Sequence, residues 1–244
     1  MKVEKRGQLR EGKAKILFET DQPQRYLIQY FKDDATAFNA LKKDTIQDKG
    51  TVNNTVSTWI FQHLTKHGVP THFVEKLSAR EMLVRTVDII PVEVVVRNRA
   101  AGSILKKLGL EKGQPFNPPL VEFFYKSDSL GDPPIGETHI LQFGWATRPE
   151  IEAMTKLSLE VNGILKDLFG RCGLELIDFK LEFGKEREGG RLVLADEFSP
   201  DGCRLWDKTT GESKDKDRFR QDLGGVREAY LEVQERLARV LEAK

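Results

Sequence analysis

The sequence predicts an α+β fold in which a β-rich N-terminal lobe, residues 1–90, precedes a mixed α/β lobe, residues 91–244, with a cleft between them. Short β-prone runs dominate the first lobe. In the second lobe, two stretches with apolar residues at helical spacing enclose two strand-like segments. The chain has 244 residues, 39% of them hydrophobic, so it is long enough to bury a sizeable core.

The N-terminal lobe is expected to contain strands separated by polar turns. Three runs carry the pattern: 16–18, 26–31 and 81–85. One helix over 54–67 interrupts them, because apolar residues recur there at every fourth position. Gly68 and Pro70 follow this stretch and are typical helix stop signals.

The second lobe begins with a buried strand over 92–96 and a short helix over 103–108 that ends at Gly109. Residues 109–134 contain five prolines and three glycines, which favours a long loop or connector. A helix is expected from Thr147, which forms a capping box with Glu150, to residue 170. Two strands and a last helix complete the prediction: 174–183, 192–198 and 226–241.

Composition excludes several classes of protein. The 39 Lys and Arg residues nearly balance the 38 Asp and Glu residues, which disfavours a protein that coats nucleic acid or an anionic membrane. No apolar run approaches the roughly 20 residues of a membrane helix, and the charged N-terminus is unlike a signal peptide. Cys172 and Cys203 have no metal-site spacing. We therefore expect a cytoplasmic protein with free thiols, without nucleic-acid or membrane partners.

The segment Glu11-Gly12-Lys13-Ala14-Lys15 is a candidate phosphate-binding site. Glycine lets a backbone approach a phosphate closely, and two lysines spaced two apart on a strand share a face. This is not a Walker motif, and an ordinary solvated strand edge with lysines explains the same residues.

Two of the predicted strands carry carboxylates. Asp178, Lys180 and Glu182 alternate with apolar residues, and pairing of the two strands as a hairpin would bring Asp196 alongside. Carboxylates that converge on one sheet face suit Mg²⁺, which binds through one or two carboxylates plus substrate phosphates. A half-buried hairpin with its polar face in water is the alternative.

The stretch from Arg97 to Ser103 follows a predicted strand and opens a short helix. Its two arginines could clamp an anion, and the Ser103 hydroxyl lies near a helix N-terminus. Ion pairing of the arginines with surface carboxylates is the other interpretation. Further on, the turn 199–202 and the mixed-charge stretch 215–220 are each typical of ordinary surface structure, and the four histidines lack metal-ligand spacing.

Taken together, these segments resemble the SAICAR synthetase family (phosphoribosylaminoimidazole-succinocarboxamide synthases) of purine biosynthesis over nearly the whole chain. The resemblance rests on seven segments in the family's order: EGKAK (11–15), KGTVNN (49–54), PVEVVVRNRAAGS (91–103), NPPL (117–120), DFKLEFG (178–184), DEFSPDGCRLWD (196–207) and DKDRFRQDLGG (215–225). It implies a two-lobed SAICAR-synthase-like fold with an ATP cleft between the lobes. It also implies a ligase that joins carboxyaminoimidazole ribonucleotide (CAIR) to L-aspartate through an acyl phosphate, while ATP becomes ADP and phosphate.

The resemblance also implies roles for individual residues. ATP binding falls on Gly12, Lys13, Ala14, Lys15, Arg85, Val87, Ile89 and Lys126. Substrate binding falls on Arg97, Ser103, Asp132, Lys180, Arg204, Lys216 and Arg220. The catalytic residues implied are Lys180 and Asp178, and the Mg²⁺ ligands are Glu182 and Asp196. The aspartate pocket is placed by neighbourhood on Arg97, Asp132 and Lys180, and relatives suggest a homo-oligomer, with a dimer favoured.

Two other functions are compatible with a two-lobed nucleotide site. A kinase should show HRD-type and DFG motifs, and neither is present in the sequence. A catalytically silent nucleotide-binding module should lack the metal-binding carboxylates, yet Glu182 and Asp196 are both present. The sequence therefore favours the ligase.

Overall fold

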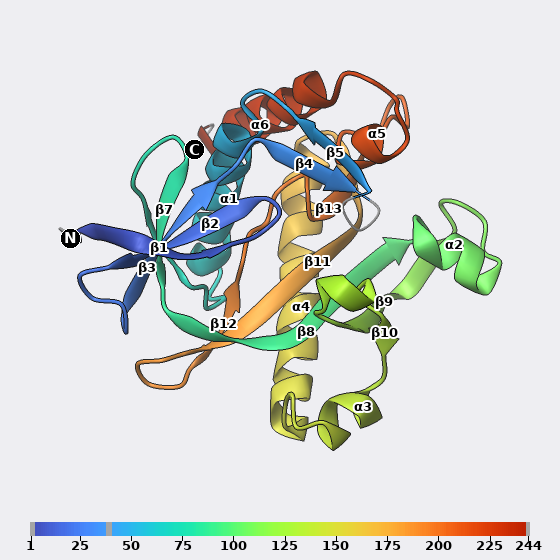
Figure 1. Cartoon of the computed structure of the whole chain (residues 1–244). Coiled ribbons are helices and arrows are strands. Elements are labelled where there is room, and N and C mark those ends of the chain that lie inside the picture. The colour runs from blue at the N-terminus through green and yellow to red at the C-terminus, as the bar shows by residue number, and fades with distance from the viewer. Residues whose placement is uncertain (1–2, 38–40, 243–244) are drawn as a thin grey trace.

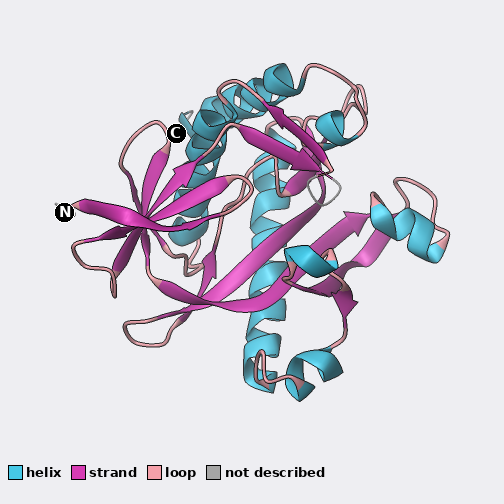
Figure 2. Ribbon diagram, in the orientation of Figure 1, coloured by secondary structure: helices cyan, strands magenta, loops and turns pink. Residues whose placement is uncertain are grey.

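Two antiparallel sheets, with helices packed on them, make up the computed structural model, which describes residues 3–37 and 41–242 (Figure 1). Figure 2 shows how helices and strands mix along the whole chain, which confirms the predicted α+β class. None of the helices in the described part of the chain is long and apolar enough to cross a membrane.

The first sheet has the strand order β1-β2-β3-β7-β6. Its strands are β1 (Lys5–Glu11), β2 (Lys15–Thr20), β3 (Tyr26–Phe31), β6 (Phe73–Lys76) and β7 (Glu81–Arg85). Helix α1 (Lys49–Lys66) packs on this sheet through β3, β6 and β7. A separate hairpin follows β3: β4 (Asp34–Ala37) and β5 (Lys42–Thr45). The three predicted strands are confirmed as β2, β3 and β7.

The second sheet has the order β10-β9-β8-β11-β12, and β13 pairs with β11 beyond the end of β12. Its strands are β8 (Val87–Arg99), β9 (Pro115–Tyr125), β10 (Pro134–Ile135), β11 (Leu174–Glu186), β12 (Leu192–Ala195) and β13 (Cys203–Asp207). The long helix α4 (Arg148–Arg171) lies along β8 and β11, as Figures 1 and 2 show. Helix α6 (Val226–Glu242) packs against α1 and α4.

Short helices connect these elements. They are α2 (Ser103–Leu108), the 3₁₀ helix η1 (Asp128–Leu130), α3 (Glu137–Gln142) and α5 (Asp217–Arg220). The prediction of α2 was correct in both bounds, because Gly109 adopts the left-handed conformation that ends it, with φ 64°. The capping box of α4 is also confirmed, since the Thr147 N–H and hydroxyl both donate to Glu150 Oε2.

The predicted loop over 109–134 was wrong, because its central residues, Pro115–Tyr125, form β9. Prolines are tolerated in β9 where pairing is weak. The Pro118–Pro119 pair lies where the register between β9 and β8 shifts, and the two-residue β10 faces only Phe123 and Phe124 on the other edge. Order in the aromatic run at the end of this stretch is confirmed.

Two other boundaries differ from the sequence prediction. Helix α1 begins at Lys49, five residues before the predicted start at 54, because Asp33 accepts the Gly50 N–H at 2.8 Å and caps a polar first turn. Strand β12 ends at Ala195 rather than 198, because Asp196 has a left-handed φ of 65° that breaks the extended chain. The chain therefore turns at Asp196, directly beside the sheet.

One hydrophobic core joins the two sheets. Its buried residues run from α1 through both sheets to α4, and include Ile60, Phe61, Val94 and Phe179. Backbone bonds add a direct link, since the His72 N–H donates to the Leu194 carbonyl at 2.8 Å. The predicted boundary after residue 90 falls inside β8, and the division into two domains stays a prediction.

Candidate active-site cleft

A cleft of about 550 Å³ collects side chains from both sheets. Strands β2, β3 and β7 contribute from the first sheet, and β8, β11 and β13 from the second, together with the loop after β12. All the predicted site residues line this cleft except Ser103, which is exposed at the start of α2. The fold thus gathers residues that are distant in sequence, while their individual roles stay predictions.

The turn between β1 and β2 carries the predicted phosphate-binding segment. The Gly12 N–H donates to the Lys15 carbonyl at 2.8 Å and closes the turn. At its tip, the Lys13 ammonium lies 2.7 Å from Asp128 Oδ1 in η1, on the opposite side of the cleft. A phosphate that binds Lys13 must therefore compete with the Asp128 carboxylate.

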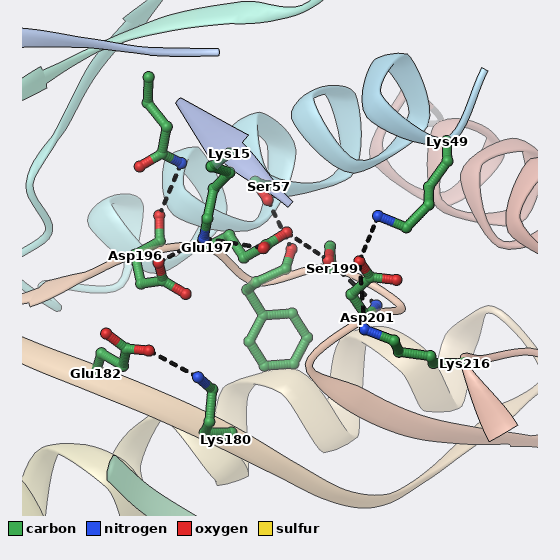
Figure 3. A network of polar contacts seen from close by, with 12 residues as sticks. Lys15, Lys49, Ser57, Lys180, Glu182, Asp196, Glu197, Ser199, Asp201 and Lys216 are labelled. Atoms are coloured by element: carbon green, nitrogen blue, oxygen red, sulfur yellow. Dashed lines mark hydrogen bonds and ion pairs between the residues drawn. The ribbon is translucent and has the colours of Figure 1, made fainter. Parts of the chain in front are cut away.

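Lys15 enters the cleft from β2 and contacts two carboxylates at once (Figure 3). Its ammonium donates to Asp196 Oδ1 and lies 2.9 Å from Glu197 Oε1. Burial alone would lower the pKa of Lys15, but these two carboxylates raise it above its ordinary value. For Asp196, burial is outweighed by the cations Lys15, Lys180 and Lys126, which lower the pKa of the carboxyl below its usual range. Lys15 is therefore charged in the cleft.

Glu182 on β11 is the centre of a second group of ion pairs. Its Oε1 accepts hydrogen bonds from Lys126 and Lys180, both at 2.7 Å, and Lys180 also donates to Glu93 Oε1 at 2.7 Å. Burial alone would lower the pKa of Lys180, but Glu182 and Glu93 raise it well above its ordinary value. Since Glu182 pairs with Ala195 in the β11–β12 register, its side chain lies close to that of Asp196 (Figure 3).

Three arginines and two aspartates occupy another part of the cleft. Arg97 and Arg204 both donate to Asp178 Oδ2, at 2.8 and 2.9 Å. Asp217 accepts from Arg204 Nε at 2.7 Å and from Arg220 Nη1 at 2.6 Å. Asp178 is buried between its two arginines, so its carboxylate orients their guanidinium groups. Its predicted catalytic role stays a prediction.

The small residues before α2 serve this arginine cluster. Gly102 has φ 69°, and a Cβ built there would lie 2.4 Å from Arg204 Nη2. A glycine is therefore required for the close approach of the guanidinium. The sequence interpretation of this stretch as an anion-binding segment placed Ser103 in the site. In the structure, the small residue Gly102 instead makes room for the guanidinium of Arg204.

Lys216 belongs to a buried group around Asp201. Lys49, from the start of α1, lies 2.6 Å from Asp201 Oδ2, and Lys216 lies 3.9 Å from the same atom. The Tyr230 hydroxyl donates to Asp201 Oδ1 at 2.6 Å. Burial lowers the pKa of Lys216. The Asp201 carboxylate raises this pKa, but by less than burial lowers it. Asp201 and Lys216 both line the cleft, so an anion bound there would find Lys216 incompletely neutralised.

The apolar wall of the cleft lies where the end of β7 connects to the start of β8. Arg85 ends β7, and its Nε lies 3.3 Å from Glu186 Oε1. Val87 and Ile89 follow at the start of β8. These residues line the cleft together with apolar side chains of the first sheet: Leu17, Leu27 and Val84. Of the residues to which the resemblance gives ATP binding, Val87 and Ile89 thus lie at the apolar part of the cleft.

Several cleft residues were not predicted. Glu197 and Asp201 stand inside the quoted motifs but were given no role, and the same holds for Lys49, which is buried behind the cleft against Asp201. Gln29 was overlooked although a polar residue on the apolar strand β3 is a signal, and it donates to the Asp196 carbonyl at 3.1 Å. His72 carried no sequence signal, because its position depends on the pairing of residues 71–72 with β12.

The donor set of the cleft fits a magnesium ion. Glu182 is a buried carboxylate and the neighbouring Asp196 a partly buried one, and Mg²⁺ commonly takes one or two carboxylates plus substrate phosphates. Among residues 3–37 and 41–242, no group of three or more His, Cys, Asp or Glu side chains is arranged to hold a metal on its own.

Comparison with known proteins agrees with this geometry. The sequence profile described as SAICAR synthetase matches residues 8–237. The phosphoribosylaminoimidazole-succinocarboxamide synthase of Novosphingobium aromaticivorans is 56% identical over 237 residues, which cover 96% of this chain and 90% of that protein.

Solved structures give the same result. The crystal structure of the phosphoribosylaminoimidazole-succinocarboxamide synthase from Ehrlichia chaffeensis superimposes with a TM-score of 0.92 at 49% identity, covering 94% of this chain and 98% of that one. A SAICAR synthetase in complex with ADP superimposes with a TM-score of 0.90 at 44% identity, covering 97% of both chains.

Proposed function

The chain belongs to the SAICAR synthetase family, and from this premise we propose that it is an ATP-dependent ligase of purine biosynthesis. It joins the carboxylate of CAIR to the amine of L-aspartate and releases ADP and phosphate. The observation that carries the proposal is the convergence of Lys15, Lys180, Glu182 and Asp196 in one cleft, beside an apolar wall on one side and an arginine cluster on the other.

ATP would lie along the first sheet. The apolar surface that includes Val87 and Ile89 suits the adenine ring, and Lys13 and Lys15 present ammonium groups to the phosphates. Lys126 and Lys180 approach from the second sheet. A SAICAR synthetase of the same fold has been solved with ADP, which supports a nucleotide site in this cleft.

Glu182 and Asp196 would hold Mg²⁺, which when bound neutralises the phosphate charge that develops during transfer. The lysines supply further positive charge in a buried site where it is worth more than in water. No side chain needs to form a covalent bond with substrate. The residues act by positioning and charge neutralisation.

The chemical difficulty is the CAIR carboxylate, which does not react with an amine directly. Attack of a carboxylate oxygen on the γ-phosphorus forms a mixed acyl phosphate and releases ADP. The aspartate amine then adds to the acyl carbon, loses a proton and expels phosphate, leaving an amide. Lys180 would partly neutralise the carboxylate as it approaches ATP, and hydrogen bonds to Glu93 and Glu182 fix the position of its ammonium in the cleft.

The arginine cluster would bind the phosphate and carboxylate groups of CAIR. Arg97 and Arg204 are held in fixed orientations by Asp178, which preorganises them for an anion. Lys216 and Arg220 line the same region. Arg97, Lys180 and Asp132 remain the proposed aspartate contacts, and a homo-oligomer, with a dimer favoured, remains a prediction.

A coupled assay of ADP release tests the proposal. We expect ADP to form in proportion to product only when CAIR, L-aspartate and Mg²⁺ are all present. ADP formation that needs neither CAIR nor aspartate would identify a different phosphotransferase. Absence of ADP formation from every combination, in a protein that still binds ADP, would identify a silent nucleotide-binding module.

The metal-binding role is tested by Asp196→Asn. Removing one of two carboxylate ligands should reduce kcat at least a hundredfold, because loss of an outer-shell partner of a ligand alone costs about 10- to 100-fold. The variant should keep its circular dichroism spectrum, because the isosteric amide can still accept a hydrogen bond from Lys15. Near-normal turnover at saturating Mg²⁺ would refute the assignment.

A further inference from the structure

We propose that Glu197 is a positioning residue for the metal site: it holds the Lys15 ammonium so that the neighbouring Asp196 is free to bind the divalent cation. The inference rests on the proposed function, because it assumes that Asp196 is a metal ligand. It assigns a task to a carboxylate that neither the sequence motifs nor the family comparison singled out.

The first observation is that Lys15 has two carboxylate partners from consecutive residues. Its Nζ donates to Asp196 Oδ1 and lies 2.9 Å from Glu197 Oε1. The side chains of Lys15 and Glu197 are 15% and 9% exposed, so water contributes little to neutralising this ammonium. If Asp196 were its only partner, Lys15 and a metal ion would compete directly for one carboxylate.

The second observation is that Glu197 is fixed from its other side. Its Oε2 accepts a hydrogen bond from the Ser199 hydroxyl at 2.6 Å, and Ser199 is fully buried. The Ser199 Oγ also accepts the Asp201 N–H at 3.2 Å, while the Ser57 hydroxyl of α1 donates to the Phe198 carbonyl at 3.1 Å. Figure 3 shows Glu197 between Lys15 and Ser199, so a contact independent of Asp196 fixes its carboxylate.

The charges in the cleft favour a shift of Lys15 from Asp196 to Glu197 when a divalent cation binds. Without a metal, Asp196 and Glu182 are neutralised by Lys15, Lys126 and Lys180. A divalent cation that binds both carboxylates repels these ammonium groups, and Lys15 must then turn to another anion. Glu197 is already within 2.9 Å of it, so the lysine stays in the cleft, beside the phosphates that it is proposed to bind.

The test measures the affinity of Mn²⁺ for the protein saturated with ADP, by electron paramagnetic resonance of the free ion. We expect Glu197→Gln to raise the Mn²⁺ Kd about tenfold, the lower end of losses seen for partners of metal ligands. Asp128→Asn is the matched control, because it removes one carboxylate from the same cleft but from Lys13, which is paired with neither proposed metal ligand. An equal change in Kd for the two variants would mean that only net charge matters, and would overturn the proposal.

Two further variants separate positioning from general structure. Ser199→Ala keeps all charges and removes the hydrogen bond that fixes Glu197, so the Kd should rise about threefold, consistent with a single weakened contact. In a Lys15→Met background, Glu197→Gln should have no larger effect than Asp128→Asn, since the residue to be held is gone. Additive effects of Lys15→Met and Glu197→Gln would contradict the inference.

The failure of the proposed function would look different. If Asp196→Asn leaves the Mn²⁺ Kd unchanged, the metal site itself is wrongly placed, and the inference falls with it. If Asp196→Asn weakens Mn²⁺ binding but Glu197→Gln does not, the metal site stands and only the role of Glu197 is refuted. Should Glu197→Gln fail to fold, the Ser199→Ala result decides, and an unchanged Kd overturns the proposal.

Discussion

Replacement of Lys49 by methionine should destabilise the protein by about 3 kcal/mol, the lower end of the range for breaking a buried ion pair. The Lys49 side chain is 1% exposed and its ammonium lies 2.6 Å from Asp201 Oδ2, whose side chain is 7% exposed. Methionine keeps the apolar stem but leaves Asp201 without its nearest cation. The cost stays at the lower end because Tyr230 still donates to Asp201 and Lys216 remains 3.9 Å away.

The reverse substitution should cost more. Asp201→Asn leaves the buried Lys49 and the partly buried Lys216 as two cations around a neutral amide, so we expect a loss of about 5 kcal/mol. In the double variant, Lys49→Met with Asp201→Asn, neither buried charge of the pair remains. Its loss should therefore be smaller than the sum of the two single losses by at least about 2 kcal/mol.

Urea unfolding followed by circular dichroism at pH 7.5 measures these differences. The m-value should be unchanged, so that a shift of the midpoint reports stability alone. A loss of less than about 1 kcal/mol for Lys49→Met, or additive losses in the double variant, would refute the claim that this ion pair is a buried and coupled unit.

Two further predictions follow from burial. Burial lowers the pKa of His72 to about 3 from the ordinary 6.5, so the unfolded chain takes up the proton first. The stability from a neutral His72 is therefore complete above pH 6.5 and is lost as the pH falls toward 3. At pH 4.5 the wild type should have lost about 3 kcal/mol more than His72→Leu by urea unfolding, and equal losses would contradict the buried environment. Burial likewise raises the pKa of the Cys203 thiol well above its usual value. Iodoacetamide should then modify it, by mass spectrometry, at least tenfold more slowly in the native protein than in urea, and equal rates would show an accessible thiolate.

Much of the fold could be predicted because local patterns decided it. Strands β3 and β7 combine apolar β-prone residues with polar turns, and α2 is closed by Gly109. The sequence prediction failed for strands whose formation depends on contacts with distant parts of the chain. Strand β1 is exposed along its whole length and polar, so nothing local distinguishes it from a turn, and β9 keeps three prolines in a strand only because pairing is irregular there.

The candidate site shows the same division. The motif resemblance indicated Lys15, Glu182 and Asp196, and the fold brings all three into one cleft. Alternation along β11 alone could not distinguish a metal site from a solvated hairpin. The role of Glu197 was beyond sequence reasoning, because it depends on contact with a lysine on a different sheet and on a turn that starts at the left-handed Asp196.

Oxygen-18 transfer tests the central claim most directly, namely that this cleft activates the CAIR carboxylate with ATP. CAIR labelled with oxygen-18 in its carboxylate is incubated with ATP, Mg²⁺, L-aspartate and the enzyme, and the phosphate released is analysed by mass spectrometry. Because a carboxylate oxygen becomes the bridge of the acyl phosphate, each phosphate formed should carry one labelled oxygen. Phosphate without label, released together with product, would contradict the account.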